Sequence, residues 1–318
     1  MKKIKQKKEP LVSVIMPAFN GEKYIRDAIE SILHQTYVNW ELIIIDDCST
    51  DETLKIINSY TDNRIMLFCN KNNKGIAEST NRGIEKSQGK YIALLDDDDV
   101  AEYDRLSLQV NYLENHPEID ILGGRTTLID EQGQVIDYCG IPRNNPRYIK
   151  AVLLFKCMDF MNGTAMIRRD FIKKHNLYYK NDCYGMQDYR FYIESSKVGN
   201  ISTINKFLLK YRVHEARETN RNFEKHKVER AKKYAQFQRY SLQESGFRLD
   251  EESLELINKA LAERDGKCES KQEIVKLYQV FQEILKQGKA MRIDYLYELE
   301  HVCRINLSKQ LIQLKGLF

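Results

Sequence analysis

The sequence predicts an α/β protein with a mostly parallel central sheet, covered by helices on both faces, and an all-helical C-terminal region. Over the first hundred residues, short apolar strands alternate with helical segments, which is typical of a parallel sheet. The strands are apolar throughout rather than at every second residue, so both of their faces should be buried. Beyond residue 220 there is no proline, and apolar residues recur at helical spacing.

The predicted elements follow one another closely along the chain. Strands are expected at Val12–Met16, Leu42–Ile45, Ile65–Phe68 and Tyr91–Leu95. Helices are expected from Tyr24 onward, at Thr53–Tyr60, at Ile76–Ser87 and at Arg105–Leu113. In the C-terminal region an amphipathic stripe is formed by Ile274, Leu277, Tyr278, Phe281 and Leu285.

Composition limits the class of protein. The chain has 318 residues, of which 42% are apolar and 30% charged, and this composition fits a globular protein. Its apolar runs are far shorter than the ~20 residues of a spanning helix, and no apolar segment typical of a secretory signal follows the first lysines. Seven scattered cysteines without a C-x-x-C pair indicate reduced thiols. We therefore expect a cytoplasmic protein.

Charge divides the chain into three parts. Residues 1–10 carry a net charge of +4 and residues 221–318 another +4, whereas residues 11–220 carry −4. We predict a basic tail (1–10), an α/β domain (11–220) and a helical region (221–318). The acidic middle argues against nucleic-acid binding. The basic ends are either solvated surface or a peripheral contact with the inner face of an anionic membrane, and the amphipathic C-terminal helices also fit a homodimer.

Two acidic clusters directly follow apolar strands. One strand leads into Asp46 and Asp47, and another leads into Asp96–Asp99. Because ligands bind outside the carboxyl ends of parallel strands, both clusters should lie at one edge of the sheet. Crowded carboxylates need a cation or hydrogen-bond donors beside them, and a hard divalent metal shared with diphosphate oxygens fits best. If the chain stays extended, Asp96 and Asp98 point to the same side, so Asp98 would hold the metal while Asp96 faces the same ion or a ribose.

Several of these residues have a structural alternative. A carboxylate of Asp96–Asp99 could cap the next helix, although capping uses one carboxylate and not four. Thr50 and Asp51 are better explained as helix caps, which leaves Asp47 to bind a ligand. The ring of Phe19 fits both a base-stacking role and a contact with the following helix. The chain has neither a G-x-G-x-x-G nor a P-loop motif, so neither a dinucleotide-binding enzyme nor a P-loop NTPase is supported.

Four ordered segments resemble family 2 glycosyltransferases of the GT-A fold, which use nucleotide-sugar donors. The segments are Val12–Asn20, Glu41–Asp51, Asn73–Gly75 with Asn81–Gly83, and Gly89–Asp99. The resemblance covers about residues 10–215 and implies an enzyme of the bacterial cell-envelope polysaccharide type. It implies inverting, metal-dependent transfer of a hexose from a UDP-sugar to a hydroxyl of a glycan or lipid-linked glycan acceptor.

The same resemblance implies a nucleotide site and a metal site. Phe19 and Pro17 would line the uracil pocket, and Asp47 would accept a hydrogen bond from the base imide. Asp98 would be the main ligand of Mg²⁺ or Mn²⁺ within a D-x-D element, and Asp96 would assist it. The full set implied for the nucleotide is Pro17, Ala18, Phe19, Asn20, Asp46, Asp47, Lys74, Gly75, Asp96 and Asp97.

The second half of the resemblance supplies a general base and a histidine. The family usually has Glu-Asp before a helix, and this chain has Gln187-Asp188. Asp188 is the implied base that deprotonates the acceptor hydroxyl, with an N-cap as its structural alternative. Gln187 departs from the family and points to an alternative, a catalytically silent nucleotide-sugar-binding or scaffolding protein, whereas the intact Asp188 and the Asp96–Asp99 run favour an enzyme. His214 ends a Y-R-x-H segment and is predicted as a third metal ligand, with a diphosphate contact or a structural role as alternatives.

Overall fold

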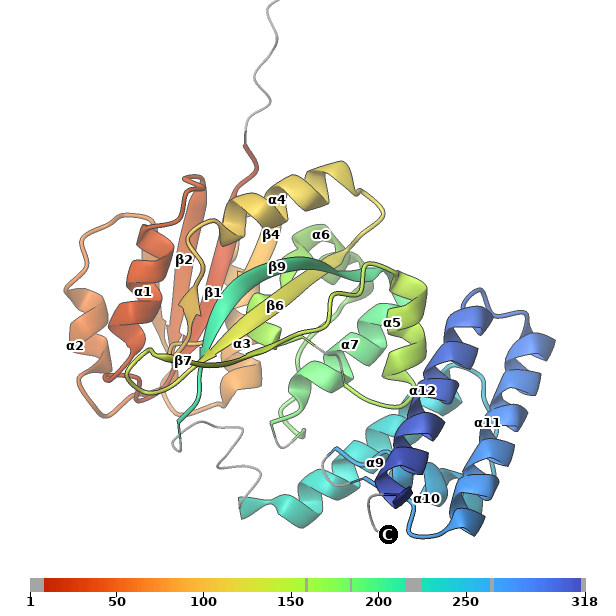
Figure 1. Cartoon of the computed structure of the whole chain (residues 1–318). Coiled ribbons are helices and arrows are strands. Elements are labelled where there is room, and N and C mark those ends of the chain that lie inside the picture. The colour runs from red at the N-terminus through yellow and green to blue at the C-terminus, as the bar shows by residue number, and fades with distance from the viewer. Residues whose placement is uncertain (1–8, 158–159, 184, 215–224, 264–265, 316–318) are drawn as a thin grey trace, which may run out of the picture. The chain divides into compact units, whose positions relative to one another are not determined.

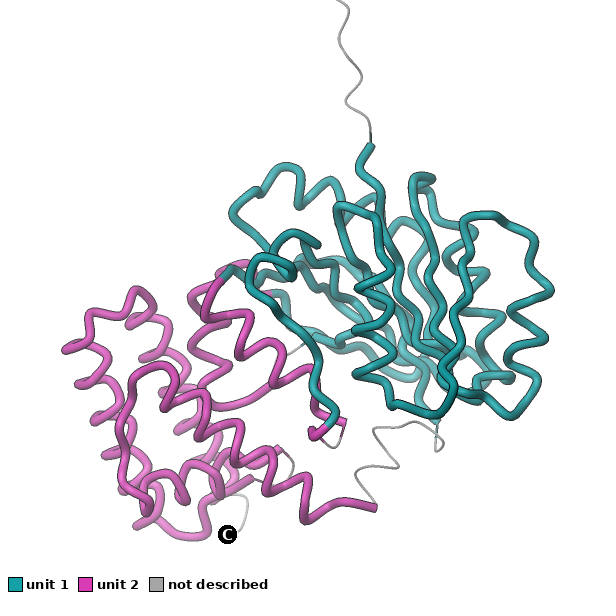
Figure 2. Tube along the Cα trace, turned by 180° about the vertical axis from the view of Figure 1, so that it is seen from behind, with its two compact units in different colours: residues 1–142, 159–181, 199–214 teal, residues 143–158, 182–198, 215–318 magenta. Residues whose placement is uncertain are grey.

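The structure is a computed structural model that describes residues 9–157, 160–183, 185–214, 225–263 and 266–315 (Figure 1). Most of the predicted basic tail over residues 1–10 lies outside this range. The chain forms two compact units, coloured separately in Figure 2. The first comprises residues 1–142, 159–181 and 199–214, and the second comprises residues 143–158, 182–198 and 215–318.

The first unit is built on a sheet whose strands follow the order β3-β2-β1-β4-β8-β6-β9-β5, with β7 paired to β6. The strands are β1 (Val12–Ala18), β2 (Trp40–Asp46), β3 (Ile65–Cys69), β4 (Tyr91–Leu94), β5 (Val100–Ala101), β6 (Ile121–Ile129), β7 (Val135–Cys139), β8 (Met166–Arg168) and β9 (Ile201–Arg212). Strands β1 to β4 form a parallel half. Strand β8 is antiparallel to both neighbours, while β6 and β9 run parallel to each other. The predicted α/β class is confirmed, and the second half of the sheet is mixed.

Helices cover both faces of the parallel half, as predicted. The helices of this unit are α1 (Ile25–Leu33), α2 (Thr53–Asn58), α3 (Ile76–Lys86), α4 (Arg105–Asn115), α6 (Arg169–His175) and the short η1 (Asn162–Thr164). On one face Val14 and Met16 share a core with Ile29 of α1. On the other face α3 approaches β1 so closely that a Cβ on Gly83 would lie 2.3 Å from a methyl carbon of Ile15. Strands β1, β2 and β4 are therefore buried on both sides, which explains their continuous apolar sequence, whereas the edge strand β3 is only partly buried.

The carboxyl ends of three parallel strands lie at one edge of the sheet. Ala18 at the end of β1 pairs with Asp46 at the end of β2. Strand β4 ends at Leu94, and the N–H of Leu95 still donates to the carbonyl oxygen of Ile15 over 3.1 Å. The residues that follow these strands therefore share one edge, where the acidic clusters were predicted.

The second unit is helical. It contains α5 (Pro146–Leu153), α7 (Gln187–Val198), α9 (Lys227–Glu244), α10 (Glu251–Ala260), α11 (Lys271–Met291) and α12 (Leu296–Lys315). The predicted helical C-terminal region is thus present, and two helices from earlier in the chain join it. Within the stripe of α11, Ile274, Leu277 and Phe281 are buried in the core of this unit, so they need neither a dimer nor a membrane to cover them.

The predicted domain boundaries at residues 10 and 220 stay a prediction. The two compact units interleave along the chain, and residues 215–224 lie outside the described range. Among the helices that the structure describes, none combines the length and the apolar character needed to cross a bilayer.

Candidate functional site

Three carboxylates of the second acidic cluster converge just beyond β4. Asp96, Asp98 and Asp99 each place an oxygen within 4.8 Å of the others. The chain does not stay extended here, because the N–H of Asp99 donates to the carbonyl oxygen of Asp96 over 3.3 Å and closes a turn. The predicted pair of Asp96 and Asp98 therefore comes together through a turn, and the turn adds Asp99. Three oxygen donors in such proximity suit a hard divalent cation such as Mg²⁺ or Mn²⁺.

His214 lies at this cluster, although it is more than a hundred residues away in the sequence. Its Nε2 lies 2.9 Å from Oδ2 of Asp98, and both side chains are largely buried. Its ring also packs against Tyr24, with the centroids 5.0 Å apart. A histidine in this position can share a metal with Asp98 or donate to a bound anion.

Asp97 lies in the same turn but makes a different contact. Its Oδ2 accepts a hydrogen bond from the N–H of Phe19 over 3.1 Å. Gly21 passes so close that a Cβ there would stand 2.4 Å from the same oxygen, so a larger residue would have to displace the carboxylate of Asp97. Asp97 therefore fixes the loop that follows β1, where a nucleotide base was predicted to bind.

A fully buried arginine accompanies the cluster. Arg105, the first residue of α4, donates from Nη2 to the carbonyl oxygen of Leu94 over 2.8 Å. Burial lowers the pKa of Arg105 to about 10, while the charges of Asp99 and Asp96 act in the opposite direction. Arg105 therefore stays charged at neutral pH and offsets part of the negative charge of the cluster. Sequence reasoning missed it, because its signal is tertiary burial and not a motif.

The loop after β1 is tied to the loop after β2. The N–H of Asn20 donates to Oγ of Ser49 over 3.0 Å, and Oδ1 of Asn20 accepts from the N–H of Thr50 over 2.9 Å. Ala18 and Pro17 are the last residues of β1, and the ring of Phe19 just beyond them is 40% exposed. Pro17, Ala18, Phe19 and Asn20 thus lie at the predicted edge, where Phe19 is partly exposed.

The two aspartates after β2 have different surroundings. Asp46 accepts from the N–H of Ser49 over 3.2 Å, and its Oδ1 is buried without a hydrogen-bond partner among the described residues. Asp47 accepts from the backbone N–H groups of Lys74 and Gly75 over 2.9 and 2.8 Å. The structure therefore brings together Asp47, Lys74 and Gly75, as the prediction requires, and does so through main-chain contacts.

Asn70 completes this group and was not predicted. Its Nδ2 donates to Oδ1 of Asp47 over 2.6 Å and to Oγ of Ser79 over 2.9 Å, while Oδ1 of Asn70 accepts from Arg82. Asn70 follows β3 at the same edge of the sheet, so the rule of strand ends could have identified it. Three donors now hold Asp47, and its two oxygens together have room for about one more.

Asp188 lies in the second unit, in the first turn of α7. Its Oδ1 accepts from the N–H of Tyr189 over 2.7 Å, and its Oδ2 lies 4.0 Å from Sγ of Cys157. Burial raises the pKa of Asp188, while the hydrogen bond from Tyr189 and the charge of Arg230 lower it. Arg230 itself is paired with Glu263, with Nε 2.8 Å from Oε2. A carboxylate with a raised pKa is a better proton acceptor than an ordinary aspartate.

Both the sequence and the fold of this chain have known relatives. Residues 13–175 match the sequence profile described as Glycosyl transferase family 2. An uncharacterized glycosyltransferase of Haemophilus influenzae is 35% identical over 220 residues, which are 64% of this chain and 66% of that protein, just under two-thirds of its length. The UDP-Glc:alpha-D-GlcNAc-diphosphoundecaprenol beta-1,3-glucosyltransferase WfgD of Escherichia coli is 31% identical over 61% of this chain and 73% of its own.

Among solved structures, the crystal structure of S. aureus TarS 1-349 in complex with UDP-GlcNAc aligns with a TM-score of 0.60. The alignment covers 96% of this chain and 92% of that one at 18% sequence identity. At this identity the likeness concerns the fold, and it confirms the predicted GT-A architecture with a helical extension.

Proposed function

Because the chain belongs to glycosyl transferase family 2, we propose that it transfers a hexose, with inversion and with a divalent metal, from a UDP-sugar to a hydroxyl of a glycan or lipid-linked glycan. WfgD uses UDP-Glc by its description, and TarS was crystallised with UDP-GlcNAc, which supports a UDP-sugar as donor. The observation that carries the proposal is the convergence of Asp96, Asp98 and Asp99 at the carboxyl end of β4.

In this proposal Asp98 and Asp96 hold Mg²⁺ or Mn²⁺, with His214 as a third ligand. The ion would neutralise the diphosphate leaving group, which removes the need for a general acid. Asp99 has a different role, because its Oδ1 already accepts a hydrogen bond from the backbone N–H of Arg212 over 3.0 Å. We assign Asp99 to shaping the turn.

The uridine would bind between the first two loops. The exposed ring of Phe19 supplies a stacking surface beside Pro17, and Asp47 has room for one more donor. The N3–H of uracil is such a donor, whereas N3 of cytosine is an acceptor and would meet repulsion. The nucleotide preference would therefore follow from the three contacts that already orient Asp47. Ala18, Asn20, Asp46, Lys74, Gly75 and Asp97 would shape the rest of this pocket.

Asp188 would accept the proton of the acceptor hydroxyl. Its raised pKa supports this role, because a base with a pKa nearer to neutrality takes a proton more readily. Gln187 beside it would then bind the acceptor by hydrogen bonds and without a charge. A scaffolding role, a peripheral membrane contact and a homodimer remain predictions from the sequence.

The proposal is tested by calorimetry with UDP. We expect UDP to bind tightly in Mg²⁺ or Mn²⁺ and at least tenfold more weakly in chelator, and we expect Asp98→Asn to bind as weakly as the chelated protein. Asp104→Asn is the matched control, because Asp104 lies near the same turn and its side chain caps no helix N–H. Equal UDP affinity with and without metal would refute the metal assignment.

A second experiment separates binding from transfer. A panel of nucleotide sugars, screened by thermal stabilisation and by metal-dependent hydrolysis, identifies the donor. With that donor, Asp188→Asn should bind UDP normally and transfer about 10²–10⁴-fold more slowly. Asp182→Asn, an exposed aspartate of the same unit, serves as its control. Full turnover by Asp188→Asn would place the base elsewhere.

A further inference from the structure

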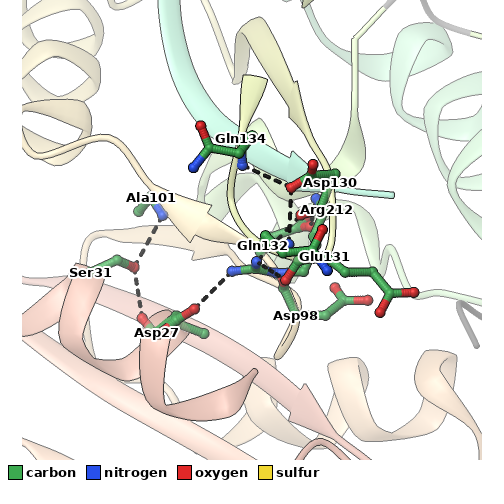
Figure 3. A network of polar contacts seen from close by, with 11 residues as sticks. Asp27, Ser31, Asp98, Ala101, Asp130, Glu131, Gln132, Gln134 and Arg212 are labelled. Atoms are coloured by element: carbon green, nitrogen blue, oxygen red, sulfur yellow. Dashed lines mark hydrogen bonds and ion pairs between the residues drawn. The ribbon is translucent and has the colours of Figure 1, made fainter. Parts of the chain in front are cut away.

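Arg212, the last residue of β9, is tied to the turn that carries the acidic cluster (Figure 3). It is only 3% exposed. Its Nε donates to the carbonyl oxygen of Asp98 over 3.0 Å, and its backbone N–H donates to Oδ1 of Asp99 over 3.0 Å. Two consecutive residues of the turn are therefore fixed by one residue from a distant strand.

The same guanidinium group reaches two further segments. Nη2 pairs with Oδ2 of Asp27 in α1 at 2.9 Å. Nη1 donates to the carbonyl oxygen of Glu131 over 3.2 Å, in the loop between β6 and β7. The ring of Tyr24 lies 4.5 Å from the guanidinium carbon. Arg212 thus joins the turn, α1 and the β6–β7 loop (Figure 3).

The Nε of Arg212 contacts the main chain of Asp98 and not its carboxylate, which matters for a metal site. Nε binds the backbone oxygen of Asp98, while the carboxylate of Asp98 faces His214. The turn is therefore held through its main chain, and this contact does not occupy a carboxylate oxygen that a cation needs. A lysine cannot replace this arrangement, because one ammonium nitrogen cannot donate to three separated acceptors in the fixed directions of a guanidinium group.

We propose that Arg212 is a positioning residue for the metal: it holds Asp98 and Asp99 in the turn that brings the three carboxylates together. This inference rests on the proposed function, since it assumes that the cluster binds a divalent cation. Groups that orient metal ligands from behind typically change metal affinity by about 10–100-fold when they are removed. A conservative change at Arg212 should therefore weaken the metal site while the overall charge stays constant.

The test measures Mn²⁺ binding by the EPR signal of free Mn²⁺, with UDP present, in the full chain. Arg212→Lys keeps the charge and is expected to raise the Kd for Mn²⁺ about tenfold. Arg168→Lys is the matched control. Arg168 also donates to backbone oxygens, those of Ile119 and Leu113, but it pairs with Tyr91 at the opposite end of β4. This control should lower the melting temperature and leave the Kd for Mn²⁺ within about twofold of the wild type.

A second variant keeps the test decisive if Arg212→Lys does not fold. Asp27 is 57% exposed, so Asp27→Asn should fold, and by neutralising the partner of Nη2 it should raise the Kd for Mn²⁺ about two- to fivefold. The inference is overturned if the folded variants bind Mn²⁺ like the wild type, or if Arg168→Lys weakens binding as much as Arg212→Lys. A wild-type chain that binds no Mn²⁺ with UDP would instead refute the proposed function itself.

Discussion

Replacing Arg105 by methionine tests whether this buried cation is a requirement of the fold. Methionine has a similar length and is apolar, so the change removes the charge and the donors with little loss of packing volume. The carbonyl oxygen of Leu94 loses a donor at 2.8 Å, that of Ala165 loses one at 3.4 Å, and Oε1 of Gln109 loses one at 3.1 Å. The nearby Asp99 and Asp96 also lose a counter-charge.

The magnitude follows from these contacts. A net hydrogen bond to a charged group contributes about 1.5–3 kcal/mol, and removing one partner of a buried charged group costs about 3–5 kcal/mol in total. The contacts at 3.1 and 3.4 Å are longer than the first, and the contributions share one group, so they do not simply add. We expect Arg105→Met to lower the free energy of unfolding by about 3–5 kcal/mol.

The assay uses the single tryptophan of the chain. Trp40 is buried in β2, in the same unit as Arg105, so its fluorescence in urea reports the unfolding of that unit. Arg26→Met, at an exposed position of α1, is the control and should change stability by no more than about 0.5 kcal/mol. A loss of less than about 1 kcal/mol for Arg105→Met would refute the reasoning, because it would mean that the buried carbonyls need no charged donor.

Three further outcomes are expected. Burial raises the pKa of Asp188 in the folded chain, so its ionisation opposes folding progressively as the pH rises from the ordinary aspartate pKa to the raised one. Asp188→Asn should therefore melt higher than the wild type at pH 7 but not at pH 3, and transfer should decline as the pH falls through the raised pKa. A lower melting temperature for Asp188→Asn at pH 7 would contradict this. Gly83→Ala should lower the free energy of unfolding, measured with Trp40, by about 1–3 kcal/mol. Alanine favours helices, but its Cβ would lie 2.3 Å from a methyl carbon of Ile15. An unchanged urea midpoint would show that α3 can move away from β1 without cost. Asp47→Asn replaces one acceptor oxygen by an NH2 group, which cannot accept the hydrogen bonds that Asp47 now receives. It should weaken UDP binding about tenfold by calorimetry, whereas an unchanged Kd would place the uracil elsewhere.

The parallel half of the sheet was predictable because burial on both faces leaves a strong signal. The strand predicted at Leu42–Ile45 is part of β2, and the one predicted at Tyr91–Leu95 overlaps β4 almost completely. Three strands of the second half gave no such signal, because β5 has two residues, β8 has three, and β7 is exposed along most of its length. Short or exposed strands are specified by their neighbours and not by their own composition.

The candidate site was predictable where a motif and a strand end coincide. Asp47 and Asp96 fall in that class, since each follows an apolar strand directly. The contributions of Asp99 and Arg105 depend on a turn and on burial next to other segments, and neither is visible in the local sequence. Asn70 is an intermediate case. Its position at the end of β3 could be predicted from the sequence, but its hydrogen bond to Asp47 could not.

The interleaving of the two units limits how the protein can be taken apart. The chain passes from one unit to the other five times, at residues 142, 158, 181, 198 and 214. Tyr189, next to Asp188, packs against Tyr234 and Phe237 of α9. A truncation after residue 214 would therefore remove α9, against which α7 packs, along with α10, α11 and α12. A chimaera of two relatives should therefore exchange all three segments of the second unit together, residues 143–158, 182–198 and 215–318.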